Sequence, residues 1–293
     1  MGLVRSWCQQ HYEKHGRSAV CVLCALAVDI AAVTTSTEVR IHTPQVAKTR
    51  QTWAPQFNGF QQQDAAECYV ALADACNEVD ISTHELLSGS LLDSRSARLT
   101  TPFWNIFGMR GRTDTECTIC GQTSTTYWME SLLHLTLPPG REVSLQACLT
   151  KYFAWHSADD RNDKCQDRCQ RQDCRRKCET VDLWPQALTF HLKRWIPTAI
   201  PHAFIKEQRM VHFPFRLDAN TLPRYSGSPY SFRSVIVHDG DPGGGHYTCY
   251  ARDTSDRWHF YDDAKKPRTC SPQVVAAACA YMLVYEKAPS TAS

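Results

Sequence analysis

A histidine and two aspartates near the end of the chain have the spacing of an acid–base pair. His246 lies at the start of one predicted strand, and Asp262 and Asp263 follow the next one. The run Asp-Thr-Ser-Asp at 253–256 predicts the turn of a hairpin between them. Folding the chain at the middle of this turn brings His246 opposite one of the two acids, with β-carbons ~5 Å apart. The sequence therefore predicts a His–carboxylate pair at the open end of a hairpin.

Such a pair can perform general acid–base chemistry. Imidazole titrates near physiological pH, and a carboxylate that binds one ring nitrogen fixes the orientation of the ring. Beside a thiol, the pair would activate a cysteine nucleophile. An isolated histidine on a strand is usually structural, but three glycines at 243–245 and the facing acids favour a functional site here.

The chain contains fifteen cysteines, and their spacing favours metal binding over disulfides. The number is odd, and Cys117-Thr-Ile-Cys120 has the spacing of one half of a zinc knuckle. A tetrahedral zinc needs two further thiolate or imidazole ligands. Spacing alone leaves four candidates for them: Cys165, Cys169, Cys174 and Cys178.

Cys21 and Cys24 are the candidates for a nucleophile within the chain. They fall at the start of a predicted helix, where a thiol pKa is lowered. No small, amide-rich segment precedes them to form an oxyanion hole. We interpret both as thiols that pack the helix. A core position is also predicted for Cys68, Cys76, Cys148, Cys249 and Cys279.

Length and composition predict an ordinary globular chain. The 293 residues suffice for one large domain or two small ones. The net charge of +2 gives no field that would favour nucleic acid or an anionic membrane. The longest apolar run, 274–285, is shorter than the ~18 residues that a membrane-spanning helix needs. With no secretory leader expected and an odd number of cysteines, we expect a cytoplasmic or nuclear protein.

Helices are predicted in the first third of the chain and strands in the remainder. Asp64-Ala-Ala-Glu67 has the form of a capping box, and apolar residues recur at three and four from 65 to 79. They predict a helix of about four turns, and 20–28 predicts another. Residues 34–62 suit a loop or a partial helix. Alternating residues at 133–137, 188–192 and 235–237 predict strands with one face inward.

Five ordered blocks and a closing strand resemble the ubiquitin-specific protease family. The blocks are Gln62-Gln63-Asp64-Ala65-Ala66-Glu67, Cys117-Thr-Ile-Cys120, Leu183-Trp-Pro185 with the following residues to Trp195, Gly244-Gly-His246-Tyr-Thr-Cys-Tyr250, and Trp258-His-Phe-Tyr-Asp-Asp263; the strand is Ala280-Tyr-Met-Leu-Val-Tyr285. Each block alone is weak evidence for the family, but the five blocks in this order are specific for it.

The resemblance implies an α+β fold of the papain-like cysteine protease type in one domain, 1–293. Residues 1–100 would form the remainder of a helical thumb, 101–185 mostly zinc-bearing fingers, and 186–293 a β-rich palm with the histidine. The implied partner is ubiquitin, alone or attached to proteins, with its C-terminal tail in isopeptide linkage.

The resemblance also assigns roles to residues. His246 would exchange protons, Asp262 would orient it, and Asp263 would support the site. The implied contacts of the ubiquitin tail are Gln63, Asp64, Gly244, Gly245 and Tyr247, and the glycines would leave room for a Gly-Gly tail. The spacing of the family selects Cys165 and Cys169 to complete a structural Zn²⁺ site with Cys117 and Cys120.

One departure from the family concerns the nucleophile. The family carries it in a Gly-Asn-Thr-Cys box, and the 293 residues contain no such box. The residues around Trp7-Cys8 and the segment Cys21-Val-Leu-Cys24-Ala-Leu resemble the segment that follows the box in some members. We therefore expect a deubiquitinase whose nucleophile is absent from these residues, or alternatively an inactive ubiquitin-binding scaffold. A zinc-finger nucleic-acid binder is disfavoured by the near-zero charge.

Overall fold

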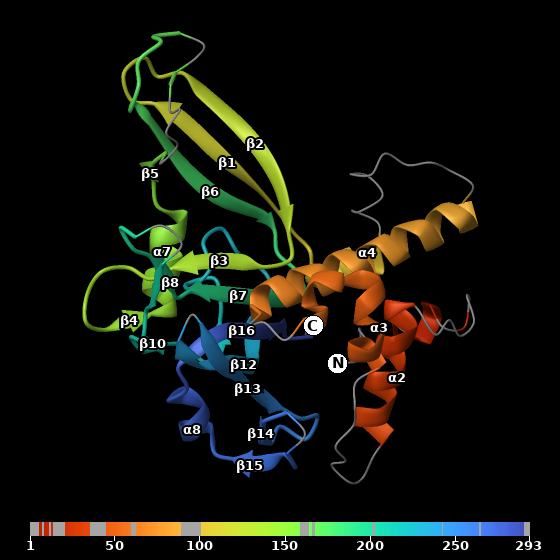
Figure 1. Cartoon of the computed structure of the whole chain (residues 1–293). Helices are drawn as coiled ribbons and strands as arrows, with labels where there is room; N and C mark the ends of the chain where they lie inside the picture. Colours follow the sequence, from red (N-terminus) through yellow and green to blue (C-terminus); the bar gives the residue numbers. More distant parts are fainter. Residues whose placement is uncertain are drawn as a thin grey trace.

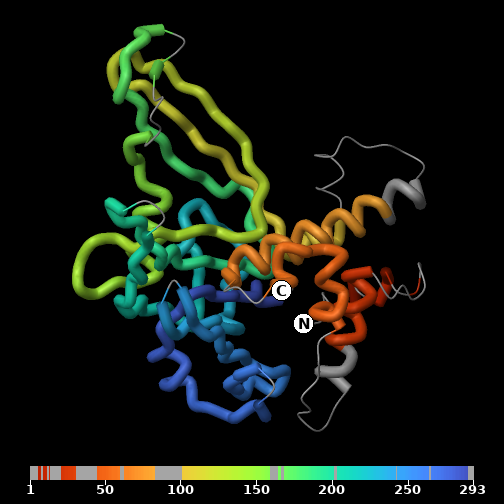
Figure 2. Tube along the Cα trace, in the orientation of Figure 1, coloured from red at the N-terminus to blue at the C-terminus, as the bar shows by residue number. Residues whose placement is uncertain are grey.

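The computed structural model describes residues 6–7, 9–11, 13, 21–35, 45–59, 63–88, 101–158, 164–165, 168–200, 203–241, 243–263 and 265–289. They form an α+β fold, as predicted, with helices on one side, a long projecting sheet and a second sheet at the base (Figure 1). Figure 2 follows the chain from the helices through the projecting sheet to the base sheet. Within these ranges no helix is long and apolar enough to cross a membrane.

The helical part begins the chain. Its elements are α2 (Val22–Thr35), α3 (Gln45–Trp53), the 3-10 helix η1 (Pro55–Asn58), α4 (Ala65–Ser88) and α6 (Pro102–Phe107). Helix α4 begins where predicted, because Asp64 accepts hydrogen bonds from the backbone N–H groups of Ala66 and Glu67. The predicted length was wrong, since α4 has 24 residues. No glycine or proline occurs between 80 and 88 to end it earlier.

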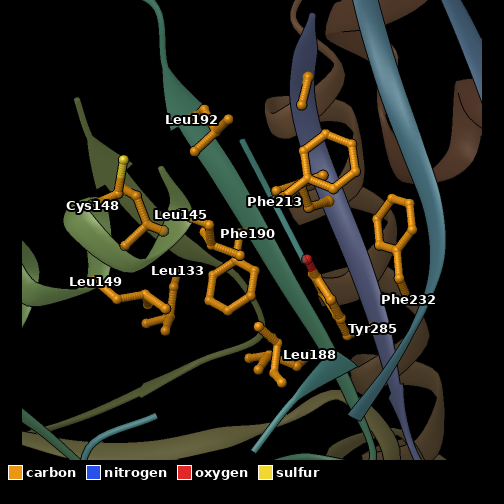
Figure 3. Close-up of a cluster of buried hydrophobic side chains, with 14 of the residues drawn as sticks. Leu133, Leu145, Cys148, Leu149, Leu188, Phe190, Leu192, Phe213, Phe232 and Tyr285 are labelled. Carbon is orange, nitrogen blue, oxygen red and sulfur yellow. The ribbon is translucent and has the colours of Figure 1, made fainter. Parts of the chain in front are cut away.

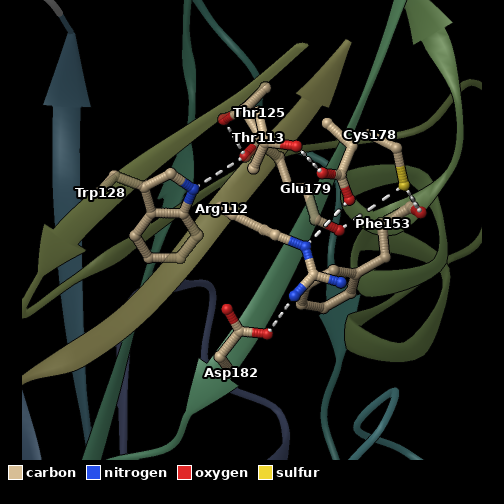
Figure 4. Close-up of polar contacts among 9 residues, drawn as sticks. Arg112, Thr113, Thr125, Trp128, Phe153, Cys178, Glu179 and Asp182 are labelled. Atoms are coloured by element: carbon tan, nitrogen blue, oxygen red, sulfur yellow. Dashed lines mark hydrogen bonds and ion pairs between the residues drawn. The ribbon is translucent and has the colours of Figure 1, made fainter. Parts of the chain in front are cut away.

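The projecting sheet has the strand order β2-β1-β6-β5, with all pairs antiparallel. Its strands are β1 (Met109–Cys117), β2 (Thr123–Glu130), β5 (His156–Ser157) and β6 (Arg175–Leu183). Polar side chains join the strands: Glu179 accepts hydrogen bonds from Thr113 and Trp128, and Arg112 pairs with Asp182 at 2.7 Å (Figure 4). The sheet is therefore held by its backbone ladder and a polar network.

The base sheet has the order β15-β14-β13-β12-β16-β7-β3, with β11 paired to β12. Its strands are β3 (Leu133–Thr136), β7 (Ala187–Lys193), β11 (Arg216–Leu217), β12 (Tyr230–Asp241), β13 (Gly244–Arg252), β14 (Trp258–Tyr261), β15 (Arg268–Cys270) and β16 (Ala280–Lys287). The three strands predicted from alternation correspond to β3, β7 and β12, although β3 ends one residue before Leu137. Smaller elements complete the fold: β4 (Val143–Ser144), α7 (Leu145–Phe153), β8 (Trp195–Pro197), β9 (Phe204–Lys206), β10 (Val211–His212) and α8 (Pro272–Ala276).

The main hydrophobic core lies between the base sheet and α7. Phe190 and Tyr285 of the sheet are fully buried together with Leu145 and Leu149 of α7 (Figure 3). The prediction that each strand has only one inward face was wrong for β7, where Thr189 and His191 on the other face are also buried. The reason is that β7 lies between β16 and β3 in the sheet, and that α6 packs against it while Tyr69 of α4 hydrogen-bonds to Thr189.

Phe190 tests how much stability this core provides. Replacing Phe190 with alanine removes a fully buried ring, so the free energy of unfolding should fall by about 3–5 kcal/mol. Phe204→Ala is the matched control, because that ring is 48% exposed, and its cost should stay below about 0.5 kcal/mol. Chemical denaturation of both variants measures the difference. Equal losses would contradict the position of the core.

Candidate active site and cysteine cluster

The predicted hairpin is formed by β13 and β14. The strands pair from Arg252 opposite Trp258 to Cys249 opposite Tyr261. Beyond this point the chain turns, with a positive φ of 45° at Asp263. The expectation that His246 and an acid are directly opposed on paired strands was therefore wrong: the acids reach the histidine from a turn.

His246 nevertheless lies between the two carboxylates, as the sequence predicted. Its Nε2 is 2.7 Å from Asp262 Oδ1, a hydrogen-bond distance, and its Nδ1 is 3.8 Å from Asp263 Oδ2, which is too long for one. Asp262 therefore holds one ring nitrogen and leaves the other for proton exchange. The catalytic roles of these three residues stay predictions.

A lysine that the sequence analysis did not single out supports Asp262. Lys265 Nζ lies 2.7 Å from Asp262 Oδ2. The hydrogen bond from Lys265, and then the one from His246, lower the pKa of Asp262 below its usual value. Asp262 is thus a carboxylate at neutral pH and accepts the imidazole N–H.

The glycines before His246 do not all serve the role that the sequence suggested. Gly244 has open space where a side chain would be. A side chain on Gly245 would instead collide with the imidazole of His238 and with the backbone of the neighbouring strand. Close packing within the base sheet therefore requires Gly245, whatever substrate binds.

Asp64 connects the helical part to the base sheet. Besides capping α4, its Oδ2 accepts hydrogen bonds from the Tyr281 hydroxyl and from Trp195 Nε1. Burial alone would raise the pKa of Asp64, but the hydrogen bonds from Tyr281 and from the α4 backbone outweigh it and lower the pKa. The charge of Asp64 thus stabilises the junction between the two parts.

Two cavities meet at Asp64. The smaller, of about 620 Å³, lies between the helical part and the base sheet, and Gln63, Tyr247 and Asp263 line it together with Asp64. The larger, of about 1150 Å³, lies on the other side of Asp64 and reaches Trp195. The structure thus gathers three of the predicted tail contacts and one predicted catalytic acid around a single cavity; Gly244 and Gly245 are not among its lining residues.

A histidine pair that the sequence analysis missed also lines the larger cavity. His134 and His191 lie side by side on the parallel strands β3 and β7, with their Nδ1 atoms 2.8 Å apart. Burial and the neighbouring His134 lower the pKa of His191 to about 4, so it is neutral at pH 7. Finding this pair from the sequence would have required the parallel register of the two strands.

Four cysteines converge at the tip of the projecting sheet. The sulfur atoms of Cys117, Cys120, Cys165 and Cys169 all lie within 4.8 Å of one another. The structure thus brings together the four residues that the spacing of the family selected. Backbone N–H groups of Cys120 and Ile119 hydrogen-bond to Cys117 and lower its thiol pKa to about 6. Four thiols with supporting amides fit a tetrahedral zinc site.

The two alternative ligands occupy different places. Cys174 is buried next to the cluster, with its sulfur 3.5 Å from that of Cys117. Cys178 lies away from the tip, where its thiol donates to the Phe153 carbonyl at 3.2 Å (Figure 4). Cys178 is therefore excluded as a ligand of this cluster.

The cysteines assigned to the core are not all buried. Cys76 and Cys148 are buried as predicted, but Cys68, Cys249 and Cys279 are only partly buried. Cys68 and Cys249 line the smaller cavity, because α4 and the base sheet do not close over them. No disulfide joins the fourteen cysteines in the part of the chain that the structure describes.

The chain belongs to the family described as ubiquitin carboxyl-terminal hydrolase, whose pattern matches residues 3–285. Ubiquitin carboxyl-terminal hydrolase 2 of Rattus norvegicus is 29% identical over 286 residues, covering 88% of this chain and 45% of the rat protein. Ubiquitin carboxyl-terminal hydrolase Usp2 of Drosophila melanogaster is 26% identical over 253 residues, covering 79% and 26%. The chain thus spans less than half the length of these relatives.

Solved structures confirm the fold. A yeast SAGA DUB module superposes with a TM-score of 0.78 and 18% identity, covering 98% of this chain and 63% of the matched chain. The SAGA Ubp8/Sgf11/Sus1/Sgf73 DUB module bound to ubiquitin aldehyde gives a TM-score of 0.76 and 20% identity, covering 98% and 64%. The resemblance inferred from the ordered blocks is therefore confirmed at the level of family and fold.

Asp64→Asn tests whether the charge at the junction matters. The amide retains a cap but loses charge-assisted hydrogen bonds, so unfolding at pH 7 should become easier by about 1–3 kcal/mol. Because the folded pKa is depressed, this stabilisation is present above the unfolded value of about 4 and is lost as the pH falls through the lower folded pKa.

The stability difference between the wild type and Asp64→Asn should therefore shrink in acid. Denaturant titrations at pH 7 and at about pH 3.5 measure it. Glu142→Gln, at an exposed site, is the control and should change stability little at either pH. An Asp64→Asn difference that stays equal at both values would show that the carboxylate charge is not involved.

Proposed function

We propose that this chain carries the acid–base pair and the substrate cleft of a ubiquitin-specific cysteine protease, which hydrolyses the isopeptide bond after the last glycine of ubiquitin. The observation that carries this proposal is the 2.7 Å hydrogen bond between His246 Nε2 and Asp262, beside the cavities that meet at Asp64. Structures of the same fold bound to ubiquitin aldehyde and to monoubiquitin support ubiquitin as the ligand.

The geometry gives each group a step in the reaction. A cysteine thiol gives its proton to His246 Nδ1, because Asp262 occupies Nε2. The thiolate attacks the glycine carbonyl, and the imidazolium returns the proton to the departing lysine amine. Water then cleaves the thioester: the same nitrogen takes the proton of the water and returns it to the departing cysteine thiolate, and ubiquitin leaves with a free C-terminal carboxylate. Asp262 stabilises the imidazolium and keeps the ring oriented throughout.

The nucleophile must approach His246 from the smaller cavity, because Asp263 lines that cavity and lies beside Nδ1. Cys68 and Cys249 line it too, but burial raises the pKa of both thiols. Burial also raises the pKa of Cys21. None of these three thiols is therefore prepared as a thiolate, and the proposed nucleophile is a cysteine in a Gly-Asn-Thr-Cys box of the family.

The larger cavity, which shares Asp64 with the smaller one, suits the basic residues of the ubiquitin tail, while the terminal glycines would lie in the smaller cavity beside His246. Four acids of α4 and its cap line the larger cavity: Asp64, Glu67, Asp74 and Glu78. Lys193 is the basic residue among its lining side chains. Acids in this excess would attract the arginines of the tail and guide it toward His246.

Binding without hydrolysis is the alternative function, and a trapping experiment separates the two. The 293-residue chain is incubated with ubiquitin that carries a C-terminal electrophile. We expect reversible binding without a covalent adduct, since none of the described thiols is placed for attack. An adduct mapped to Cys21, Cys24 or Cys68 would contradict the assignment of the nucleophile, and absence of any binding would contradict the cleft.

The acid–base pair is tested in a chain extended at its N-terminus by the Gly-Asn-Thr-Cys box. His246→Ala should abolish turnover of a ubiquitin substrate. Asp262→Ala should lower kcat about 10- to 10⁴-fold with KM nearly unchanged, because the imidazole is no longer held. Asp263→Ala should cost less.

His156→Ala, on the projecting sheet, is the control for these variants and should leave turnover intact. A larger loss from Asp263→Ala than from Asp262→Ala would exchange the two roles. Small, equal losses from both acids would contradict the whole assignment.

We propose that the cysteine cluster of the projecting sheet holds one structural Zn²⁺. Cys165→Ser/Cys169→Ser should remove this metal, because two thiolates cannot retain it against a chelator. Cys178→Ser is the control and should retain it. Elemental analysis after mild chelation measures the content. Full retention in the double variant would contradict the assignment of Cys165 and Cys169 as ligands.

A further inference from the structure

A fifth cysteine lies against the four-thiol cluster at the tip of the projecting sheet. Cys174 is 3% exposed, and its sulfur is 3.5 Å from that of Cys117. The four sulfur atoms that lie within 4.8 Å of one another belong to Cys117, Cys120, Cys165 and Cys169. Four ligands close a tetrahedral zinc site, so Cys174 would remain a thiol in contact with one of the ligands.

The ends of two paired strands hold Cys117 and Cys174 together. Cys117 ends β1 opposite Arg175, the first residue of β6. Thr118 donates to the Cys174 carbonyl from its backbone N–H at 2.7 Å and from its hydroxyl at 3.0 Å. Paired strands lie ~5 Å apart, which is within the Cα separations that disulfides span. An S–S bond is ~2.0 Å long, so the two sulfur atoms need to approach by only ~1.5 Å.

The hydrogen bonds of the Cys174 thiol direct a sulfur lone pair at Cys117. The thiol donates its proton to the Arg171 carbonyl at 3.2 Å, and its sulfur accepts from the Cys117 thiol. A thiol that attacks a neighbouring sulfur uses its lone pair to form the new bond. Cys174 is therefore oriented for attack on the Cys117 sulfur.

Packing of an apolar core does not explain a thiol at position 174. Among the described residues, the buried group to which Cys174 belongs consists of cysteines alone. Cys148, by contrast, is a buried thiol that packs among aliphatic and aromatic side chains of the main core. The surroundings of Cys174 thus indicate sulfur chemistry.

We propose that Cys117 and Cys174 form an oxidation site, in which Cys174 is the resolving thiol. Hydrogen peroxide converts the Cys117 thiolate into a sulfenic acid, and hydroxide leaves. The Cys174 sulfur then attacks the sulfenic sulfur: an S–S bond forms, the S–O bond breaks, and the departing hydroxide takes the Cys174 proton as water. The two sulfur atoms give up two electrons, and the peroxide is reduced to hydroxide and water.

The disulfide would lower the metal affinity of the cysteine cluster. It removes one of four donors, and the three thiolates that remain hold zinc more weakly. A reducing thiol would restore all four donors, so the modification is reversible. This consequence rests on the zinc site proposed above, whereas the formation of the disulfide does not.

Peptide mapping of the 293-residue chain tests the proposal. The chain is treated with hydrogen peroxide, its remaining thiols are alkylated, and it is digested with trypsin without reduction. Trypsin leaves Cys174 as the one cysteine of residues 172–175, and Cys117 together with Cys120 in residues 113–141. We expect a peptide in which a disulfide joins these two ranges, with fragmentation placing the link at Cys117. Dithiothreitol should abolish this peptide.

The metal content of the same samples is measured with a chromogenic chelator. Zinc release should rise in step with the cross-link. A chain that holds no zinc before oxidation should still form the cross-link. Failure of the proposed zinc site and failure of the oxidation site are therefore distinguishable.

Cys174→Ser separates a resolving thiol from a ligand. The variant keeps the four proposed ligands, so it should hold as much zinc as the wild type before oxidation. Without the resolving thiol, Cys117 should accumulate as sulfinic acid, which dithiothreitol does not reduce. Cys178→Ser is the matched control, because this β6 thiol donates to the Phe153 carbonyl away from the cluster, and it should cross-link like the wild type.

Three results would overturn the proposal. The first is a Cys174 that is fully alkylated in the oxidised wild type, whatever other disulfides form; this result needs no variant. The second is a link from Cys174 to Cys120 in place of Cys117. The third is a folded Cys174→Ser chain that lacks, before any oxidant is added, the zinc that the wild type holds, which would make Cys174 a ligand.

Discussion

The arrangement of the cleft depends on the hydrogen bonds that the Asp64 carboxylate accepts. It caps α4 through two backbone N–H groups and accepts hydrogen bonds from Tyr281 and Trp195 of the other part of the molecule. One side chain thus sets both where the helix begins and where it meets the sheet. Since both cavities border Asp64, their shape follows from this contact.

The acid–base pair relies on a different kind of support. His246 lies on a strand whose neighbours fix its backbone, whereas Asp262 lies in the turn after β14. Lys265 holds the second oxygen of Asp262, so the carboxylate has a defined orientation as well as a charge. The paired strand holds His246, and the hydrogen bond from Lys265 holds Asp262 in its turn. Together they provide the preorganisation that general acid–base catalysis needs.

Local signals predicted the features that depend on neighbours in sequence. The cap at Asp64 and the hairpin that brings His246 near two acids both follow from spacing within about twenty residues, and both are present. The hydrogen bond between Asp64 and Tyr281 joins residues 217 positions apart in the sequence, and no sequence periodicity predicts such a contact. The His134–His191 contact likewise depends on a parallel register.

Features that depend on side-chain packing could not be predicted from the sequence either. The space beside Gly245 is filled by His238, which only the folded sheet reveals. Residue spacing left four candidates for the second half of the cysteine cluster, and the choice of Cys165 and Cys169 came from the resemblance to the family. The structure excludes Cys178 because its strand position directs the thiol to a carbonyl instead.

The central claim is that the cleft around Asp64 binds the C-terminal tail of ubiquitin and presents it to His246. Titration of the 293-residue chain into isotope-labelled ubiquitin, monitored by NMR, tests this claim most directly. We predict that the largest shift changes occur in the tail, and that ubiquitin without its tail binds at least tenfold more weakly. Equal affinity of intact and tail-less ubiquitin would contradict the account.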